Sequence, residues 1–144
     1  MKDLRLEQQL CFAVYSASHA FTRFYKPLLA QLGVTYPQYL ALLALWEQDG
    51  LSVTAIGDRL LLDSGTLTPV LKRLEAQGLV TRARSTVDER QVLVSLTEQG
   101  RALRQVAEGF PTQILAASEC SGDELDGLRR ALMVLRSNLD RAVA

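Results

Sequence analysis

Cysteine and histidine are scarce in this sequence, which holds two cysteines and one histidine among 144 residues. Cys11 and Cys120 lie far apart, and such a pair does not make the disulfide framework of a small secreted domain. The sequence has no CxxC motif and no His/Cys set with zinc spacing. It also lacks a Gly-rich phosphate loop and a Ser/His/Asp arrangement. We therefore expect neither an enzyme, nor a metal, nor a cofactor.

Long apolar runs and an excess of one charge are missing too. The longest apolar run, Leu40–Trp46, is far too short to cross a membrane. The first residues carry charges and no signal-peptide core, so the expected location is the cytoplasm. Sixteen basic residues balance sixteen acidic ones. This balance argues against a protein that coats nucleic acid by bulk charge, but it allows a local DNA-binding surface.

The most informative stretch runs from Leu51 to Gly100 and reads as two short helices, a hairpin and the start of a long helix. Its second helix, predicted over Ser64–Gln77, has Asp63 or Ser64 as N-cap and Gly78 at its end. An apolar stripe defines its buried face, while small hydroxyls and cations lie on its outer face. Such a helix can lie in the major groove of DNA. The stripe comprises Leu67, Val70, Leu71 and Leu74.

In residues 79–84 and 91–96 the side chains alternate in character from one residue to the next, as in β-strands. The polar segment Ser85–Arg90 joins the two as a hairpin loop. Three helices followed by a hairpin predict a winged helix-turn-helix, a mainly α fold with a small β-hairpin wing. Arg90 at the wing tip suits a narrow minor groove, and Lys72, Arg82 and Arg84 suit phosphate contacts. The alternative is that these are ordinary solvated charges. The predicted DNA-binding residues are Ser64, Gly65, Thr66, Thr68, Pro69, Lys72, Arg73, Arg82, Arg84, Asp88 and Arg90.

Helices at both ends of the chain carry more apolar surface than one small domain needs. Residues 6–32 form a helical pattern with two adjacent apolar stripes, ended by Gly33. The last helix, after a capping box at Ser121–Glu124, has leucines at heptad-like spacing. We therefore predict a homodimer. The chain would be one domain, with dimerisation helices in residues 1–34 and 98–144 and the winged helix-turn-helix in 36–97. The leucines are Leu125, Leu128, Leu132, Leu135 and Leu139.

The wing sequence Asp88-Glu89-Arg90, followed by Val92–Gly100, resembles the signature of MarR-type transcription regulators. Segments around Cys11, Tyr25–Leu29, Leu32–Leu40 and Leu62–Pro69 are similar to the OhrR subgroup, the organic-hydroperoxide-sensing repressors. The resemblance covers nearly the whole chain through Gly100 and thins after Arg104. It implies a dimer that binds a pseudo-palindromic operator when reduced and releases it when Cys11 is oxidised.

Cys11 is the candidate sensor, because a thiolate attacks a peroxide and becomes a sulfenic acid. Tyrosine hydroxyls can donate hydrogen bonds to a thiolate and favour its charged form. Tyr25 lies on the same helical face as Cys11, but fourteen residues of helix span roughly 21 Å. Tyr25 could therefore reach only the Cys11 of a partner whose first helix runs antiparallel. The resemblance implies that Tyr25 and Tyr36 bind the reactive sulfur across the dimer. It also implies an apolar peroxide pocket formed by Phe12, Tyr15, Phe21 and Phe24.

The resemblance further implies that Cys120 is the resolving thiol, which forms a disulfide with the partner's Cys11. Several alternatives remain open at this stage. Cys11 could be a buried packing residue, and a one-cysteine mechanism could use a small cellular thiol in place of Cys120. A MarR-type regulator could instead be released by a small-molecule ligand. A thiol peroxidase, or a winged helix used only for protein contacts, is a further possibility.

Overall fold

The computed structural model describes residues 2–144, which are mostly helical. Along the sequence, helices precede and follow a central region that contains three strands. In chain order the elements are η1 (Leu6–Gln8), α1 (Leu10–Leu32), α2 (Tyr36–Glu47), β1 (Leu51–Ser52), α3 (Val53–Leu60), α4 (Ser64–Ala76), β2 (Val80–Arg84), β3 (Val92–Leu96), α5 (Glu98–Ala107), α6 (Phe110–Ser118) and α7 (Gly122–Val143).

These elements group into two compact units. The first extends to Ala107 and holds α1–α5 with the three strands, while the second runs from Glu108 to Ala144 and holds α6 and α7. The first unit has the order predicted for a winged helix-turn-helix, so the predicted fold class is confirmed.

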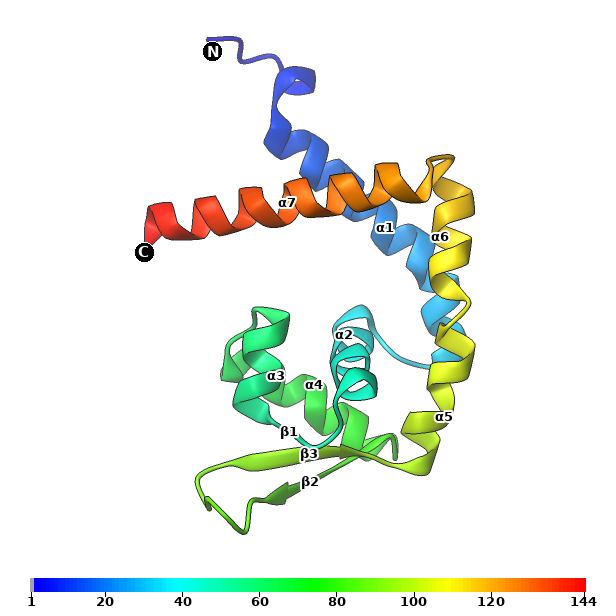
Figure 1. The fold of residues 1–144 in the computed structure, drawn as a ribbon, viewed down its shortest axis with the longest axis vertical. Coiled ribbons are helices and arrows are strands. Elements are labelled where there is room, and N and C mark those ends of the chain that lie inside the picture. Colours follow the sequence, from blue (N-terminus) through cyan, green and yellow to red (C-terminus); the bar gives the residue numbers. More distant parts are fainter. Residues whose placement is uncertain (1) are drawn as a thin grey trace. The chain divides into compact units, whose positions relative to one another are not determined.

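The sheet of the first unit has three antiparallel strands in the order β1-β3-β2. The predicted hairpin is β2 and β3, in a register that pairs Val80 with Leu96 and Arg84 with Val92. The two-residue strand β1 was not predicted, and it adds to the other edge of β3 by pairing Leu51 with Val94. Figure 1 shows α2, α3 and α4 together on one side of this sheet.

Each of α2, α3 and α4 begins directly after a residue whose side chain caps the helix. Thr35 caps α2, Ser52 caps α3 through the Ala55 amide, and Asp63, not Ser64, caps α4. Gly78 follows the end of α4 with φ of 76°, a left-handed conformation that glycine adopts without strain. Side-chain caps satisfy amides that a helix leaves unpaired at its start, so each cap fixes the residue at which its helix begins.

The core of the first unit lies between the sheet and its helices. The predicted stripe of α4 supplies three completely buried leucines, with Val70 half-buried at its edge. Leucines and an isoleucine from α2 and α3 meet them, together with Val94 of the central strand. This packing fixes the orientation of α4 and leaves its polar face outward. The completely buried side chains here are Leu42, Ile56, Leu67, Leu71, Leu74 and Val94.

The first helix is buried only at its C-terminal end. α1 continues through Pro27, and Leu28, Leu29 and Leu32 are its buried residues. Residues 10–23 are all exposed in the single chain. The predicted start at Leu6 is a separate turn of 3-10 helix, η1. The long helix after Thr97 is interrupted near Pro111, as its sequence predicts, and is divided into α5 and α6, with Pro111 in the first turn of α6.

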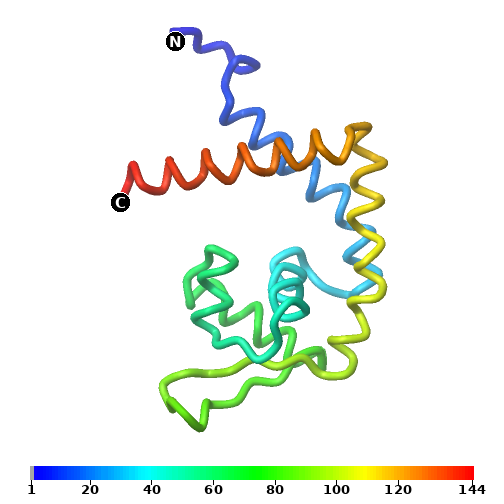
Figure 2. Tube along the Cα trace, in the orientation of Figure 1, coloured from blue at the N-terminus to red at the C-terminus, as the bar shows by residue number. Residues whose placement is uncertain are grey.

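The second unit consists of two helices joined at Glu119–Ser121, and Figure 2 traces α7 as one uninterrupted rod. The predicted capping box at Ser121 and Glu124 is confirmed. Leu128, Leu132 and Leu139 are 58%, 42% and 59% exposed, so α7 carries an uncovered apolar stripe in the single chain.

Within residues 2–144, no single helix has the length and apolar character needed to cross a membrane. Only α1 and α2 taken together pass that test of length and composition, and they are bent by 65°.

Candidate DNA-binding surface and redox site

The outer face of α4 is polar and held in place at its start. Asp63 accepts a hydrogen bond of 2.8 Å from the Thr66 amide, and this bond holds the pKa of Asp63 below its ordinary value. The Thr68 hydroxyl donates to the Ser64 carbonyl at 2.7 Å, so Thr68 is half-buried and turned toward its own helix. The other predicted contact residues of α4 are exposed: Ser64, Gly65, Thr66, Pro69, Lys72 and Arg73.

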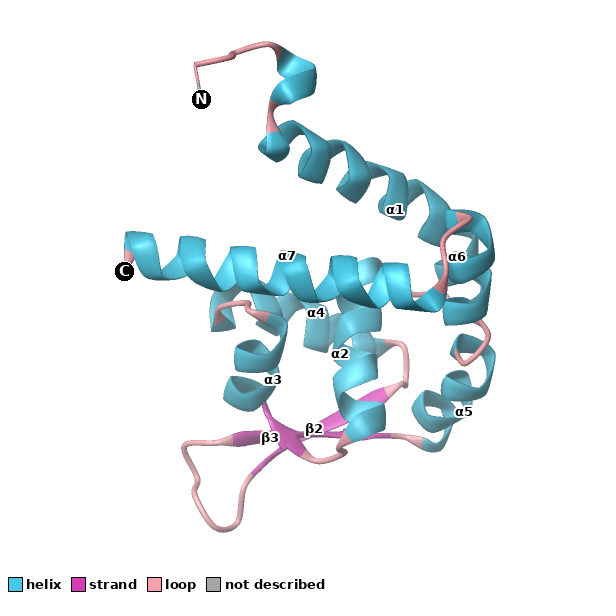
Figure 3. Ribbon diagram, turned by 45° about the horizontal axis from the view of Figure 1, so that its top comes forward, coloured by secondary structure: helices cyan, strands magenta, loops and turns pink. Residues whose placement is uncertain are grey.

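The wing is a preformed loop between β2 and β3, drawn in pink at their joined ends in Figure 3. The buried Ser85 hydroxyl accepts hydrogen bonds from the amides of Val87 and Asp88, at 3.1 and 3.2 Å. The Arg90 guanidinium donates to Asp88 at 3.1 and 3.2 Å, which lowers the pKa of Asp88. The Arg90 side chain is nevertheless 89% exposed. The loop therefore presents a cation whose direction is set before any DNA binds.

The two arginines of β2 differ in what they contact. Arg82 is held by Glu75 of α4, which accepts from its backbone amide at 3.0 Å and from its guanidinium at 3.1 and 3.2 Å. Arg84 is exposed and donates to the Glu89 carbonyl of the wing at 3.0 Å. Arg82 thus ties β2, and with it the wing, to α4, and its predicted phosphate contact remains a prediction.

Cys11 lies in the first turn of α1 as an exposed, free thiol. The alternative of a buried packing residue therefore does not hold for the single chain. Phe12 beside it and Tyr15 one turn along α1 are also exposed, by 37% and 62%, and Phe21, ten residues beyond Cys11 on the same helix, is 50% exposed. Phe24 is half-buried against the Tyr25 ring, at a centroid distance of 6.4 Å. One chain alone leaves the predicted peroxide pocket open, so a second surface would have to close it.

Tyr25 and Tyr36 meet where the end of α1 approaches the start of α2. Their ring centroids are 5.4 Å apart, and the ring of Tyr39 lies 5.8 Å from that of Tyr25. Burial raises the pKa of Tyr25 to about 12, and the phenols of Tyr39 and Tyr36 make smaller contributions in the same direction. Burial also raises the pKa of Tyr36. Both phenols therefore keep their protons at neutral pH and can donate hydrogen bonds to an anion.

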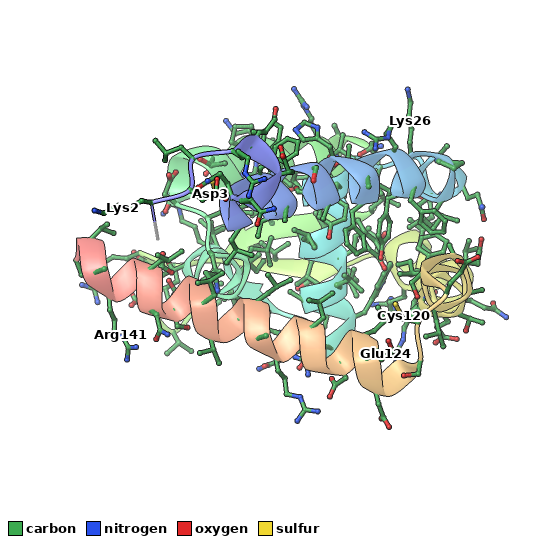
Figure 4. All side chains as sticks on the ribbon, turned by 90° about the horizontal axis from the view of Figure 1, so that it is seen from above. Lys2, Asp3, Lys26, Cys120, Glu124 and Arg141 are labelled. Carbon is green, nitrogen blue, oxygen red and sulfur yellow. The ribbon has the colours of Figure 1, made fainter. Side chains whose placement is uncertain are left out.

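Cys120 belongs to the second unit, in the joint between α6 and α7. Figure 4 labels it beside the first turn of α7, where Glu124 lies. The thiol is half-buried and donates to the Ser118 carbonyl at 3.4 Å, while the Cys120 amide donates to the Ser118 hydroxyl at 3.1 Å. Cys120 thus occupies a structured, half-buried turn between the two helices.

Several residues that organise these surfaces were missed in the sequence. Glu75 and Ser85 carry no periodic signal, because each acts through one long-range or loop contact. Asp49, in the turn before β1, accepts from the Leu96 amide at 2.8 Å and so joins that turn to β3. Gln38 could have been found, since Thr35 and Gln38 have capping-box spacing and form that box. Within residues 2–144, no cluster of three or more His, Cys, Asp or Glu side chains could hold a metal ion.

Taken together, a helix with a polar outer face and a preformed wing that carries an exposed arginine are typical of a winged-helix DNA-binding protein of the transcription-regulator class. Comparison with known families agrees with this class. A family model described as "Transcriptional regulator SarA/Rot" matches residues 23–106.

A relative from Bacillus subtilis (strain 168), the organic hydroperoxide resistance transcriptional regulator, is 54% identical over 94% of this chain and 92% of its own length. Structures of AbfR from Staphylococcus epidermidis are also similar. The reduced, DNA-bound form is 39% identical over 94% of this chain and 95% of the other, with a TM-score of 0.78. The disulfide form is 38% identical over 97% and 93%, with a TM-score of 0.65. The chain therefore belongs to the SarA/Rot and MarR-type winged-helix transcription regulators, and it is OhrR-like. These relatives are regulators and not enzymes.

Proposed function

We propose that this chain is a redox-sensing repressor that binds a pseudo-palindromic operator as a homodimer and releases it when organic hydroperoxide oxidises Cys11. The observation that carries the proposal is the exposed Cys11 thiol, set among uncovered apolar side chains in the exposed part of α1, residues 10–23. The B. subtilis relative, named for organic hydroperoxide resistance, supports the choice of signal. A regulator of this kind works in the cytoplasm, where its operator lies.

On the DNA side, α4 enters the major groove and the wing reaches the adjacent minor groove. The exposed hydroxyls of Ser64 and Thr66 read base edges or phosphates near the N-terminus of α4, with Gly65 and Pro69 allowing close approach. Lys72, Arg73 and Arg84 neutralise phosphates, which positions the helix without specifying sequence. Arg90, directed by Asp88, inserts into the minor groove. Arg82 holds the wing against α4 through Glu75.

On the sensor side, two copies of α1 run antiparallel, so the Tyr25 and Tyr36 pair of one subunit meets the partner's Cys11. α1 is continuous from Leu10 to Leu32, so Tyr25 stays roughly 21 Å from Cys11 of its own chain. The protonated phenols donate to the Cys11 thiolate. Phe12, Tyr15, Phe21 and Phe24, covered by the second copy, form an apolar pocket that favours alkyl hydroperoxides.

Oxidation proceeds in two steps, formation of a sulfenic acid and then of a disulfide. The Cys11 thiolate attacks the terminal oxygen of ROOH, the O–O bond breaks, and the alkoxide leaves as ROH after taking a proton, so that Cys11 becomes a sulfenic acid. The Cys120 thiolate of the partner subunit then attacks that sulfur. The S–O bond breaks, water leaves with one added proton, and an intersubunit disulfide forms. Two thiols thus supply the two electrons that reduce the peroxide.

The response to hydroperoxide is tested by measuring binding to a labelled operator, which is first selected from random DNA by the reduced protein. Wild type should lose this DNA on treatment with cumene hydroperoxide, whereas Cys11→Ser should keep it. A Cys11→Ser variant that still releases DNA would refute sensing at Cys11 and would favour a regulator released by a small-molecule ligand.

A non-reducing gel of the same samples tests the role of Cys120. Wild type should give a covalent dimer that is absent from both Cys11→Ser and Cys120→Ser. DNA release without a covalent dimer would instead indicate a one-cysteine mechanism, in which a small thiol caps the sulfenic acid.

A further inference from the structure

Two glutamines connect three helices at a single point of the first unit. The Gln38 side-chain amide donates to the Gln77 side-chain carbonyl at 2.8 Å, and the Gln77 amide donates to the Gly33 backbone carbonyl at 2.7 Å. The Gln38 carbonyl in turn accepts from the Thr35 amide at 2.8 Å. We call Gln38, Gln77 and the Gly33 carbonyl the glutamine clasp.

Each member of the clasp stands at a helix end. Gly33 ends α1, Gln38 lies in the first turn of α2, and Gln77 ends the recognition helix α4. Tyr36, one of the two sensor phenols, lies between Thr35 and Gln38 and contacts Tyr25 of α1. The clasp therefore connects the corner between α1 and α2, where both phenols lie, to α4 through hydrogen bonds.

The two halves of the clasp differ in their access to water. Gln38 is only 3% exposed, so loss of its partner would leave a buried amide unsatisfied. Gln77 is exposed and lines an open hollow of about 550 Å³ together with Lys26 and Arg73. Water in that hollow can replace the Gln77 bond to Gly33 at small cost. The link between α1 and α4 can thus open and close, while the link between α2 and α4 is held firmly.

We propose that Gln77 is a positioning residue that transmits a shift of the α1–α2 corner to the recognition helix. This inference rests on the proposed function, because it names the coupling between that sensor and that DNA-binding surface. When oxidation of Cys11 displaces the sensor phenols, the clasp carries the displacement to the C-terminal end of α4. Without the bond to Gly33, the end of α1 moves while α4 stays with α2, to which Gln38 still connects it.

The variant Gln77→Glu tests the bond selectively. Its carboxylate still accepts from Gln38, so the buried amide stays satisfied, but it has nothing to donate to the Gly33 carbonyl. A second variant, Gln77→Asn, adds no charge and is one methylene too short to span both partners. The control Gln48→Glu makes the same charge change on an exposed residue at the end of α2.

Three quantities are measured for each protein: DNA affinity when reduced, DNA affinity after hydroperoxide, and the rate of Cys11 oxidation by thiol alkylation and mass spectrometry. We expect both Gln77 variants to bind DNA within about threefold of wild type when reduced, and to oxidise at the wild-type rate. The ratio of oxidised to reduced Kd should fall by about fivefold or more, the lower range of ordinary coupling between sites. Gln48→Glu should keep the wild-type ratio.

An unchanged Kd ratio in both Gln77 variants would overturn the inference. So would an equal loss of affinity in the two redox states, because that pattern marks a merely structural role. If wild type and Gln48→Glu themselves kept DNA after Cys11 is oxidised, the proposed function would fail, and the inference would fall with it.

Discussion

At the scale of single residues, Glu75 decides how firmly the wing is held. β2 is an edge strand, and its outward Arg82 amide would be unpaired without the Glu75 carboxylate. Replacing Glu75 by Ala removes three hydrogen bonds to its carboxylate, two of them from the partly exposed Arg82 guanidinium. We expect a loss of roughly 1–2 kcal/mol in the free energy of unfolding, measured by urea denaturation.

The control for that substitution is Glu89→Ala, in the exposed wing. Only the backbone carbonyl of Glu89 accepts a bond, from Arg84, so its side chain is expendable for stability. Equal stability of Glu75→Ala and Glu89→Ala would show that the Arg82 anchor contributes nothing.

Tyr25 gives a second residue-scale prediction, through pH. Its pKa is raised to about 12 by burial and by the neighbouring phenols, above the ordinary value of 10. A raised pKa means that folding favours the protonated phenol. The resulting stabilisation is complete below pH 10 and is lost as the pH rises toward 12. Unfolding measurements across this window should show a smaller decline for Tyr25→Phe than for wild type, and an identical decline would contradict the burial of this hydroxyl.

At the scale of elements, the start of α5 is locked against the hairpin. A Cβ added at Gly100 would lie 2.1 Å from the Leu79 carbonyl oxygen, and the Trp46 indole donates to the Gly100 carbonyl at 2.8 Å. We expect Gly100→Ala to destabilise the protein by about 3 kcal/mol, because backbone on both sides would have to move. Thermal unfolding of purified protein measures this.

Gly127 provides the matched comparison for that prediction. It lies inside α7, and a Cβ there meets nothing within 4 Å. Gly127→Ala should therefore be neutral or stabilise by roughly 0.5–1 kcal/mol through helix propensity. A Gly100→Ala protein as stable as Gly127→Ala would refute the close packing of α5 on the hairpin.

The elements also show what sequence reasoning can reach. Caps such as Asp63 and the box of Ser121 with Glu124 act within three residues, so their signals are local and were found. The pairing of Leu51 with Val94 was missed, because a two-residue strand has no alternation to detect. The same limit applies to the candidate site: the exposed face of α4 follows from periodicity, whereas the contact of Glu75 with Arg82 depends on tertiary structure.

At the scale of the whole molecule, α1 and α7 both expose apolar side chains in the single chain, and the proposed homodimer would cover them. Leu132 lies within the apolar stripe of α7. A charge there would be buried without a partner in a dimer, which is strongly unfavourable. We expect Leu132→Glu to shift the protein to monomer in analytical ultracentrifugation and to lose most operator affinity. Ser137→Glu, an exposed position on another face of α7, should remain dimeric, and a dimeric Leu132→Glu would argue against pairing through this stripe.

The central claim is that the oxidation state of one thiol, Cys11, controls the occupancy of the operator. Fluorescence anisotropy of labelled operator DNA tests it most directly, when the fraction of oxidised Cys11 is measured by mass spectrometry in the same samples. Bound DNA should fall in proportion to oxidised Cys11, dithiothreitol should restore binding after disulfide formation, and Cys11→Ser should not respond. Full operator binding by a protein whose Cys11 is fully oxidised would contradict it.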